Sequence, residues 1–199
     1  MTEQAKDNLK IPKLAPPGAG LPALEMFLQK TIVFPLLCKI SFDSAIRLFE
    51  KESKLLLREV TLIPETLRDK KILVPRLPAI EDSSRDWSAA MVLEHLIIVC
   101  NSIKGVALLP TAGEKPPGAA DTAAVKPKGE LAGAVCLEQY RRFSEDFLKT
   151  VRGLRGDQWA TGTFEHPWFG PLTLHKWIVL AAVHQRVHRR QIEAIITRL

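Results

Sequence analysis

Two histidines four residues apart near the C-terminus are the residues of this chain best placed to do chemistry. His184 and His188 lie in a strongly helical segment, Leu174 to Leu199. Four residues of an α-helix rise about 6 Å and turn about 40° beyond a full turn, so both side chains project from one face. A third histidine, His95, lies in an earlier helical segment that opens at Trp87-Ser88. Three imidazoles that meet at one point would hold a metal ion.

Other metal chemistries fit these residues less well. A zinc protease helix reads His-Glu-x-x-His, but Gln185 follows His184 here and cannot act as a general base. Carboxylate-bridged di-iron bundles need Glu-x-x-His motifs, which neither His95 nor His188 provides. A buried imidazole without a partner costs a few kcal/mol, so the alternative to an ion is a set of hydrogen-bonding partners. A mononuclear site remains the leading interpretation.

The whole chain has the size and composition of one soluble globular domain. It has 199 residues, of which 46% are hydrophobic, and this is enough for one buried core. Charged residues, prolines or histidines interrupt each apolar run, so we expect that no stretch approaches the length of a membrane span. The first seven residues mix charges and precede no apolar signal segment, which favours a cytoplasmic location.

Charge and cysteine content disfavour further classes of protein. The formal net charge is +6, and the last helical segment contributes five basic residues against Glu193 alone. A solvated helix face explains this charge better than a nucleic-acid patch, so nucleic-acid binding is disfavoured. Cys38, Cys100 and Cys136 are odd in number and outside any C-x-x-C pattern. We therefore expect free thiols rather than disulfides or a zinc ribbon.

Hydrophobic periodicity predicts four long helices. An apolar stripe with steps of four and three residues runs from Phe42 to Ile63, broken only by Ser53. A second helix has Ser88 as its N-cap, and its inner stripe includes His95. A third helix follows residue 129, and a fourth follows Thr173 as N-cap. The predicted fold is an all-α, antiparallel four-helix bundle.

The remaining segments are predicted to be short or irregular. Residues 1–20 contain three prolines and two glycines, which is typical of a flexible leader, and residues 21–199 then form a single domain. Residues 21–38 predict an N-terminal helical extension in pieces, broken or kinked at Pro35. Residues 110–129 predict a long flexible loop between helices 2 and 3, and residues 159–172 a folded loop before the last helix.

The last helix is predicted to turn its histidines toward the core. Its inward stripe contains Trp177, Leu180, Ala181, His184, His188, Ile192 and Ile195. The residues predicted to point largely away are Lys176, Gln185, Arg186, Arg189 and Arg190.

Several short motifs stand at the starts of the predicted helices and at the end of the chain. They are Trp87-Ser88 followed by Leu93-Glu94-His95-Leu96, then His166-Pro167, Gly170 and Leu172-Thr173, and finally His184-x-x-x-His188-x-x-Gln191-Ile192. In this order they resemble the DinB-like (DinB/YfiT-like) superfamily of bacterial metal-binding four-helix bundles, over Phe42 to Leu199. The resemblance implies an up-down-down-up bundle in which His95, His184 and His188 bind a divalent ion.

The resemblance also implies a function. Characterised members of that superfamily include transferases and isomerases that depend on low-molecular-weight thiols. The expectation is a divalent-metal-dependent enzyme, with a small-thiol transferase acting on an electrophilic small molecule as the leading form. Zinc and nickel are the leading ions, with iron and manganese as alternatives, because imidazole suits several metals. The resemblance is compatible with a homodimer, and the interrupted apolar runs predict no membrane partner. The alternative is a noncatalytic binding module that a metal ion stabilises.

Two further residues are candidates for orienting a ligand or contacting a substrate. Gln191 follows His188 by three residues, and its structural alternative is a polar residue near the helix end. His166 lies in the loop before the last helix, where its structural alternative is to stabilise a turn.

Overall fold

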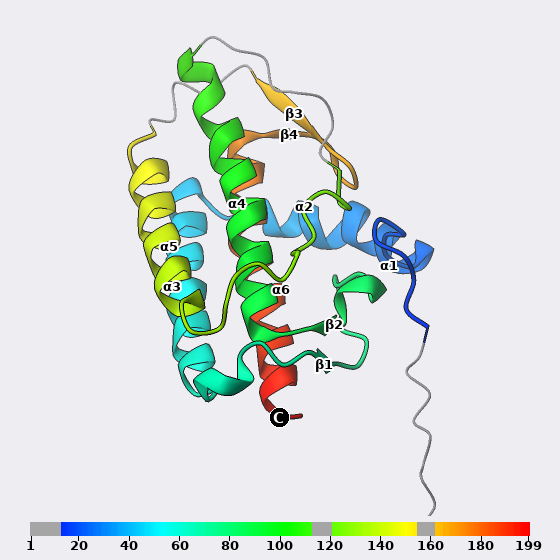
Figure 1. Ribbon diagram of the computed structural model, residues 1–199. Coiled ribbons are helices and arrows are strands. Elements are labelled where there is room, and N and C mark those ends of the chain that lie inside the picture. Colours follow the sequence, from blue (N-terminus) through cyan, green and yellow to red (C-terminus); the bar gives the residue numbers. More distant parts are fainter. Residues whose placement is uncertain (1–12, 113–120, 155–161) are drawn as a thin grey trace, which may run out of the picture.

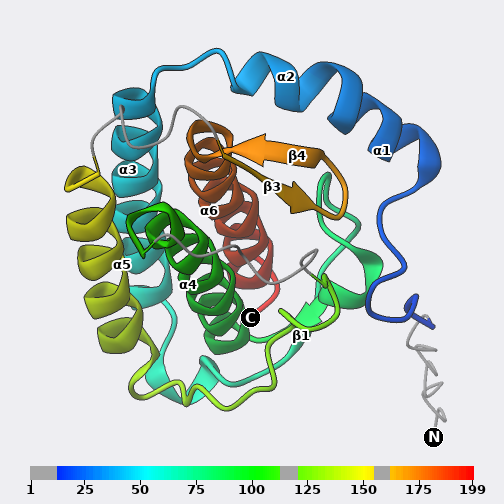
Figure 2. The same cartoon turned by 90° about the horizontal axis from the view of Figure 1, so that it is seen from above.

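The computed structural model describes residues 13–112, 121–154 and 162–199. Four long helices form a bundle: α3 (Phe42–Thr61), α4 (Ala89–Ala112), α5 (Cys136–Arg152) and α6 (Leu174–Ile196). Seen from above, they occupy four corners in the order α3, α6, α4, α5 (Figure 2). The predicted all-α four-helix bundle is confirmed.

The helix directions explain why the second and third helices are joined by a long connection. Helices α3 and α6 run in one direction and α4 and α5 in the other (Figure 1). This is the up-down-down-up order that the family resemblance implies. Because α4 and α5 are parallel neighbours, the chain must return along α4, a distance of about 36 Å for its 24 residues, before α5 begins.

The connection between α4 and α5 is folded against the bundle where the structure describes it. Helix α4 continues to Ala112, so the predicted loop begins later than residue 110. Residues 113–120 lie outside the described part of the chain. The backbone N–H groups of Lys128 and Gly129 donate to the carboxylate of Glu94 at 2.9 and 3.0 Å, which ties the segment to α4. Flexibility in residues 110–129, and in the leader 1–20, stays a prediction.

The apolar stripes predicted from the sequence form the core. Ile46, Phe49, Leu56 and Val60 of α3 are buried. Phe49 stacks on Phe147 of α5, with ring centroids 4.3 Å apart, so the two helices interlock through aromatic side chains. The three cysteines are free thiols, as predicted.

Helix starts follow the predicted capping residues. The Ser88 hydroxyl accepts the backbone N–H of Met91 at 3.1 Å at the start of α4. Thr173 occupies the N-cap position of α6 with extended backbone angles, although its side chain makes no capping hydrogen bond. Both histidine-bearing helices begin after the predicted residues, but only Ser88 caps its helix through its side chain.

An N-terminal helical extension precedes the bundle in pieces, as predicted. It consists of α1 (Ala23–Leu28), a π-helical turn (Gln29–Val33) and α2 (Phe34–Leu37). Pro35 lies in the first turn of α2, where its missing N–H interrupts regular helical bonding, and the wider π turn lies directly before it. Phe34 is buried and stacks on Phe169 at 4.2 Å, which joins the extension to the segment before α6.

Two small antiparallel sheets were not predicted. Strand β1 (Ile72–Leu73) pairs with β2 (Asp86–Trp87), and β3 (Thr163–His166) pairs with β4 (Gly170–Thr173). The prediction of a folded loop before the last helix is therefore corrected: the described part of that range is a β-hairpin beside α6 (Figure 2).

Some positions of α6 predicted to point away from the core are buried or paired. Gln185 is fully buried, and its amide oxygen accepts the hydroxyl of Tyr140 at 2.5 Å. Arg186 and Arg189 donate to Glu52 of α3 at 2.9 and 2.7 Å, and Glu52 is only 1% exposed. Helix α6 packs against both α3 and α4, so its buried arc is wider than the single stripe read from the sequence.

Among the described residues, Ala89–Leu108 has the length and mean hydropathy, 1.6, of a candidate membrane span. The expectation that no stretch approaches such a length was wrong for this helix. The segment packs in the bundle against α5 and α6, buries Leu93 and Leu96 in the core, and carries Glu94 and His95. A core helix of a bundle passes the same test, so the finding is weak evidence for membrane insertion.

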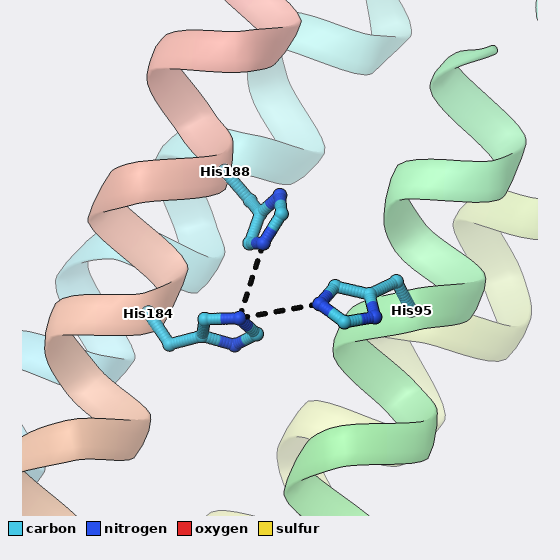
Figure 3. Close-up of side chains that lie close together, drawn as sticks. All are labelled: His95, His184 and His188. Carbon is cyan, nitrogen blue, oxygen red and sulfur yellow. Dashed lines mark hydrogen bonds between the residues drawn. The ribbon is translucent and has the colours of Figure 1, made fainter. Parts of the chain in front are cut away.

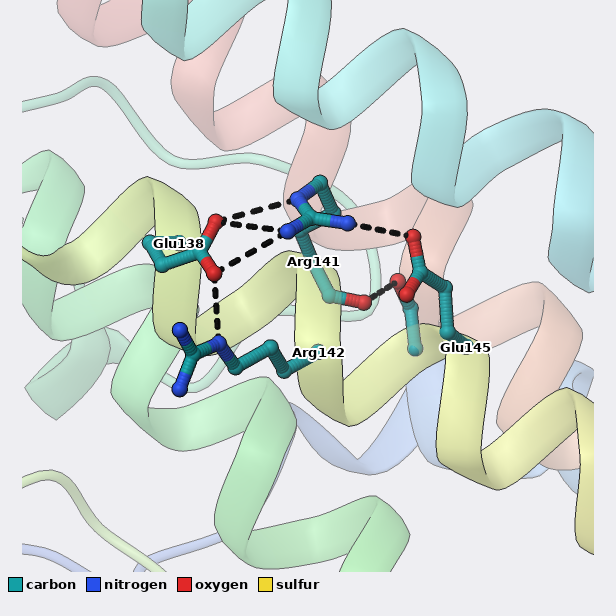
Figure 4. A network of polar contacts seen from close by, with 5 residues as sticks. Glu138, Arg141, Arg142 and Glu145 are labelled. Atoms are coloured by element: carbon teal, nitrogen blue, oxygen red, sulfur yellow. Dashed lines mark hydrogen bonds and ion pairs between the residues drawn. The ribbon is translucent and has the colours of Figure 1, made fainter.

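The outer face of α5 carries a network of exposed ion pairs. Arg141 binds Glu138 at 2.9 Å and Glu145 at 2.8 Å, and Arg142 binds Glu138 at 2.5 Å (Figure 4). Water screens such pairs, so they contribute little to stability. An open groove of about 540 Å³ lies between this face and α3. The described residues that line it include no histidine or cysteine, and its two carboxylates, Glu50 and Glu145, are paired with Lys54, Arg152 and Arg141.

Candidate metal centre

Three imidazoles meet between α4 and α6. His184 and His188 project from successive turns of α6 toward His95 of α4 (Figure 3). The Nε2 atom of His184 lies 3.2 Å from Nε2 of His95 and 3.1 Å from Nε2 of His188. One ring nitrogen of each residue lies within 4.8 Å of the other two. The structure thus brings together the three residues that the sequence predicts as metal ligands.

Hydrogen bonds on the far side of two rings determine which nitrogen carries the proton. The Nδ1 atom of His95 lies 2.7 Å from the carbonyl oxygen of Val125, which can only accept, so Nδ1 is the donor. The Nδ1 atom of His188 lies 2.8 Å from Oε1 of Gln191, whose amide nitrogen donates to the carbonyl of Ser84 at 2.7 Å. Both rings, when neutral, therefore direct an Nε2 lone pair toward His184.

Burial keeps all three rings neutral. Desolvation lowers the pKa of His95 and of His184 well below the usual value of 6.5; His188 lowers both pKa values further, and His95 also lowers that of His184. Desolvation lowers the pKa of His188 to about 4. At pH 7 each ring therefore has a free lone pair, which is the form that binds a metal ion.

The geometry fits an ion better than it fits hydrogen bonds alone. A proton on Nε2 of His184 could point at only one of the two neighbours, and without that proton both short contacts would bring lone pairs together. Its buried Nδ1 atom has no hydrogen-bond partner among the described residues. An ion bound tetrahedrally at about 2.0–2.1 Å from each nitrogen would hold the nitrogens about 3.3–3.4 Å apart, close to the two distances here.

A small cavity of about 130 Å³ opens beside the three rings. Its wall combines apolar side chains with a few polar groups, as ligand sites in proteins commonly do. The described residues that line it are Ala79, Ile80, Glu81, Ser84, His95, Val99, Thr122, Val125, Lys126, His166, Trp168, Phe169, Leu180, His184 and His188. A small molecule in this cavity would lie against the imidazoles.

The two additional candidate residues both adjoin the centre. Gln191 is fully buried and bonded to His188, so it orients that ring. His166, at the end of β3, lines the cavity, and burial lowers its pKa to about 4. Its Nδ1 atom accepts the backbone N–H groups of Trp168 and Phe169 at 3.1 and 3.3 Å, which leaves its Nε2–H as a donor. His166 therefore stabilises its turn and also adjoins the cavity.

Sequence reasoning missed the contribution of the α4–α5 connection. Val125 and Lys126 lie in the segment predicted as a flexible loop, yet Val125 bonds to His95 and both residues line the cavity. The pair Glu94-His95 could have indicated that another segment packs here. Glu94 is buried and accepts three backbone N–H groups of residues 128–131. A buried carboxylate next to a metal-ligand candidate needs such partners.

The sequence model of the DinB superfamily matches residues 49–192, more than half of the chain. The chain belongs to the DinB superfamily. The match includes all three histidines of the centre. No curated protein matches the chain by sequence.

Solved structures with the same fold include other proteins of known or described activity. YfiT from Bacillus subtilis, described as a probable metal-dependent hydrolase with an unusual four-helix bundle topology, is 20% identical with a TM-score of 0.57, over 80% of this chain and 90% of YfiT. A mycothiol-dependent maleylpyruvate isomerase is 11% identical with a TM-score of 0.59, over 80% of this chain but 63% of the isomerase. The colibactin self-resistance protein ClbS, solved with double-stranded DNA, is 13% identical with a TM-score of 0.58, over 80% of this chain and 97% of ClbS. At these identities the likeness shows the fold.

Proposed function

We propose that this DinB-superfamily protein is a divalent-metal-dependent enzyme that activates a small thiol for transfer to an electrophilic small molecule. His95, His184 and His188 would hold the ion, with zinc and nickel as the leading metals and iron and manganese as alternatives. The thiol would be a low-molecular-weight cofactor of a reducing cytoplasm, in keeping with the three free cysteines of the chain. The mycothiol dependence of a protein with the same fold is a further reason to consider a thiol.

One observation carries the proposal: two buried rings are fixed with their Nε2 lone pairs toward a third. The fixed acceptors, Val125 and Gln191, hold the protons of His95 and His188 on the far nitrogens. Such remote hydrogen bonds are what orient histidines that bind metals. An ion at the meeting point would use all three lone pairs at once.

The chain's own residues would prepare the cavity for the reaction. An ion held by three neutral imidazoles retains its full charge and an open position, so it lowers the pKa of a thiol or water bound there. Trp168 and Phe169 line the cavity, and their apolar faces would exclude water. The Nε2–H of His166 would donate to an oxygen of the electrophile, because its Nδ1 is already occupied. These groups bind and orient the substrate.

Metal content is the first experiment. Untagged protein is purified, its metals are quantified, and zinc binding is measured after chelation for the wild type and for His184→Ala. His175→Ala is the matched control, because His175 lies on the same helix but bonds to the backbone carbonyl of Ile40 at 2.8 Å. One zinc ion per chain in the wild type and the control, and none in His184→Ala, is expected. Equal binding by all three would refute the site.

The alternative function is a noncatalytic module in which the ion only ties α4 to α6. The three ligands come from these two helices, so an ion would cross-link them in either case. Activity separates the two functions. Metal-loaded protein is incubated with several bacterial thiols and a panel of electrophiles, and thiol consumption is followed. Turnover that chelation abolishes favours the enzyme, whereas metal-dependent stability without turnover favours the module.

A nucleic-acid function has less support from the charges on α6. ClbS was solved with double-stranded DNA, but the guanidinium groups of Arg186 and Arg189 are paired with Glu52 here. DNA affinity that falls steeply with salt and weakens in Arg186→Ala would favour that function. The homodimer with which the family resemblance is compatible is tested by light scattering.

A further inference from the structure

A second small cavity adjoins the one beside the three imidazoles. Its volume is about 100 Å³. The residues that line both cavities are Val99, Thr122, Val125, His166 and Leu180. A molecule bound beside the histidines would therefore have room to extend past these shared residues into the second space.

The second cavity continues the helix faces that carry the histidines. On α4, Val99 and Ile103 follow His95 by four and eight residues, and on α6, Leu180 precedes His184 by four residues. Side chains at these spacings share one face of a helix, and four residues rise about 6 Å. Helices α4 and α6 run in opposite directions, so both series lead away from the imidazoles the same way (Figure 1). The second cavity thus begins about one helical turn from the proposed metal ligands.

The two cavities differ in polarity. The first is lined by the three imidazoles and by the ion pair of Glu81 and Lys126. Among the described residues that line the second, Asp121 is the only acidic or basic side chain besides the histidine, and it is exposed. Most of the remaining wall is apolar and includes Ile103, Val106 and Trp177. Burying an apolar group in such a space is favourable and requires no polar partner.

His166 lies where the two cavities meet. The centroid of its ring is 5.3 Å from that of Trp177, which lines the second cavity, and 4.9 Å from that of Phe169, which lines the first. The Nε2–H of His166 is the proposed donor to an oxygen of the electrophile. An oxygen bound there would lie between the metal side and the apolar space.

We propose that the second cavity is the subsite for an apolar group of the electrophile, which makes the substrate a small carbonyl compound with a short alkyl chain. This inference rests on the proposed function. The thiol would lie on the metal side, the carbonyl oxygen at His166, and the alkyl chain against Val106 and Trp177. An apolar cavity of about 150 Å³ holds one benzene molecule, so this smaller cavity suits a group smaller than benzene.

Binding of unreactive methyl ketones tests the subsite without requiring turnover. Acetone, 2-butanone and 2-pentanone present the same carbonyl and differ by one methylene group each. They are titrated into zinc-loaded and metal-free protein, and the indole N–H resonances of Trp177, in the second cavity, and Trp168, in the first, are followed by NMR. Each methylene group should strengthen binding about fourfold, as followed at Trp177, in both forms of the protein.

Val106→Phe is the variant that fills the subsite, because Val106 lines the second cavity but not the first. It should bind zinc and acetone as the wild type does and lose the increase in affinity with chain length. The matched control, Val135→Phe, makes the same change at a position that is 44% exposed, and should behave as the wild type. If Val106→Phe loses helical content by circular dichroism, Ser102→Phe replaces it, since Ser102 is exposed and also lines the second cavity.

The outcomes separate this inference from the proposed function. A ketone affinity that does not depend on chain length, or that increases equally in the filled variant, overturns the apolar subsite. Resonance changes at Trp168 without changes at Trp177 overturn it as well. A chain-length dependence in a protein that binds no zinc overturns the proposed function instead and supports the subsite as a binding site of its own.

Discussion

Removing the metal should lower the thermal stability of this protein by a measurable amount. The three imidazoles come from α4 and α6, and their geometry exists only in the folded chain. An ion that binds the folded state alone, at a free concentration 100 times its Kd, stabilises that state by about 2.7 kcal/mol. For a domain of this size about 1 kcal/mol shifts Tm by about 2–4 °C, so zinc should raise Tm by about 5–11 °C.

The assay is differential scanning calorimetry of chelator-stripped protein with and without zinc at pH 7. His184→Ala removes the central ring, so its Tm should not respond to zinc. The control His175→Ala retains all three ligands and should show the full increase. A Tm that zinc leaves unchanged in the wild type, or an increase that persists in His184→Ala, would refute the reasoning about this centre.

Three further predictions follow from the residues around the centre. Gln191→Leu removes the acceptor of His188 and should weaken zinc binding about 10–100-fold in competition with a chelating dye; unchanged affinity would show that this bond does not matter. The pKa values of His188 and His166 are lowered to about 4 in the folded chain. As pH falls below 6.5, these two histidines therefore take up protons in the unfolded chain before they do so in the folded chain. Urea unfolding of the metal-free protein should therefore show a stability loss of up to about 1.4 kcal/mol per pH unit for each histidine down to about pH 4, and a flat profile would contradict this. Gln185→Leu removes the acceptor of the buried Tyr140 hydroxyl and should destabilise the fold by about 1–3 kcal/mol in urea while zinc affinity stays the same; a change in affinity instead would place Gln185 in the centre.

The bundle and its three inward histidines could be predicted because they follow helical periodicity. The stripe from Phe42 to Ile63 lies largely in the core, and the spacing of His184 and His188 places both rings on one face. Such patterns are local, so they need no knowledge of how the helices pack. His95 could be added because it falls on the inner stripe of α4.

Contacts between segments far apart in sequence could not be predicted in the same way. Gln185 is buried because α6 packs against two helices, and a single stripe cannot reveal a second buried face. The proline-rich composition around residues 110–129 gave no sign that the Val125 carbonyl would bind His95. The sequence of strand β3 indicated the β3–β4 hairpin only weakly. Phe164 and His166 alternate with the exposed Thr163 and Glu165, as residues of a strand do.

The acceptor that orients His95 is a main-chain carbonyl, in a segment whose side chains line the cavity. Side chains in this segment can therefore change in size or charge, and so alter which molecules enter, while the oxygen that aligns the ring stays in place. Insertions or deletions behave differently, because they displace the oxygen and the lining together. In this architecture a substitution in the α4–α5 connection would change the selectivity of the cavity, whereas a change in the length of the connection would remove the bond that aligns the His95 ring.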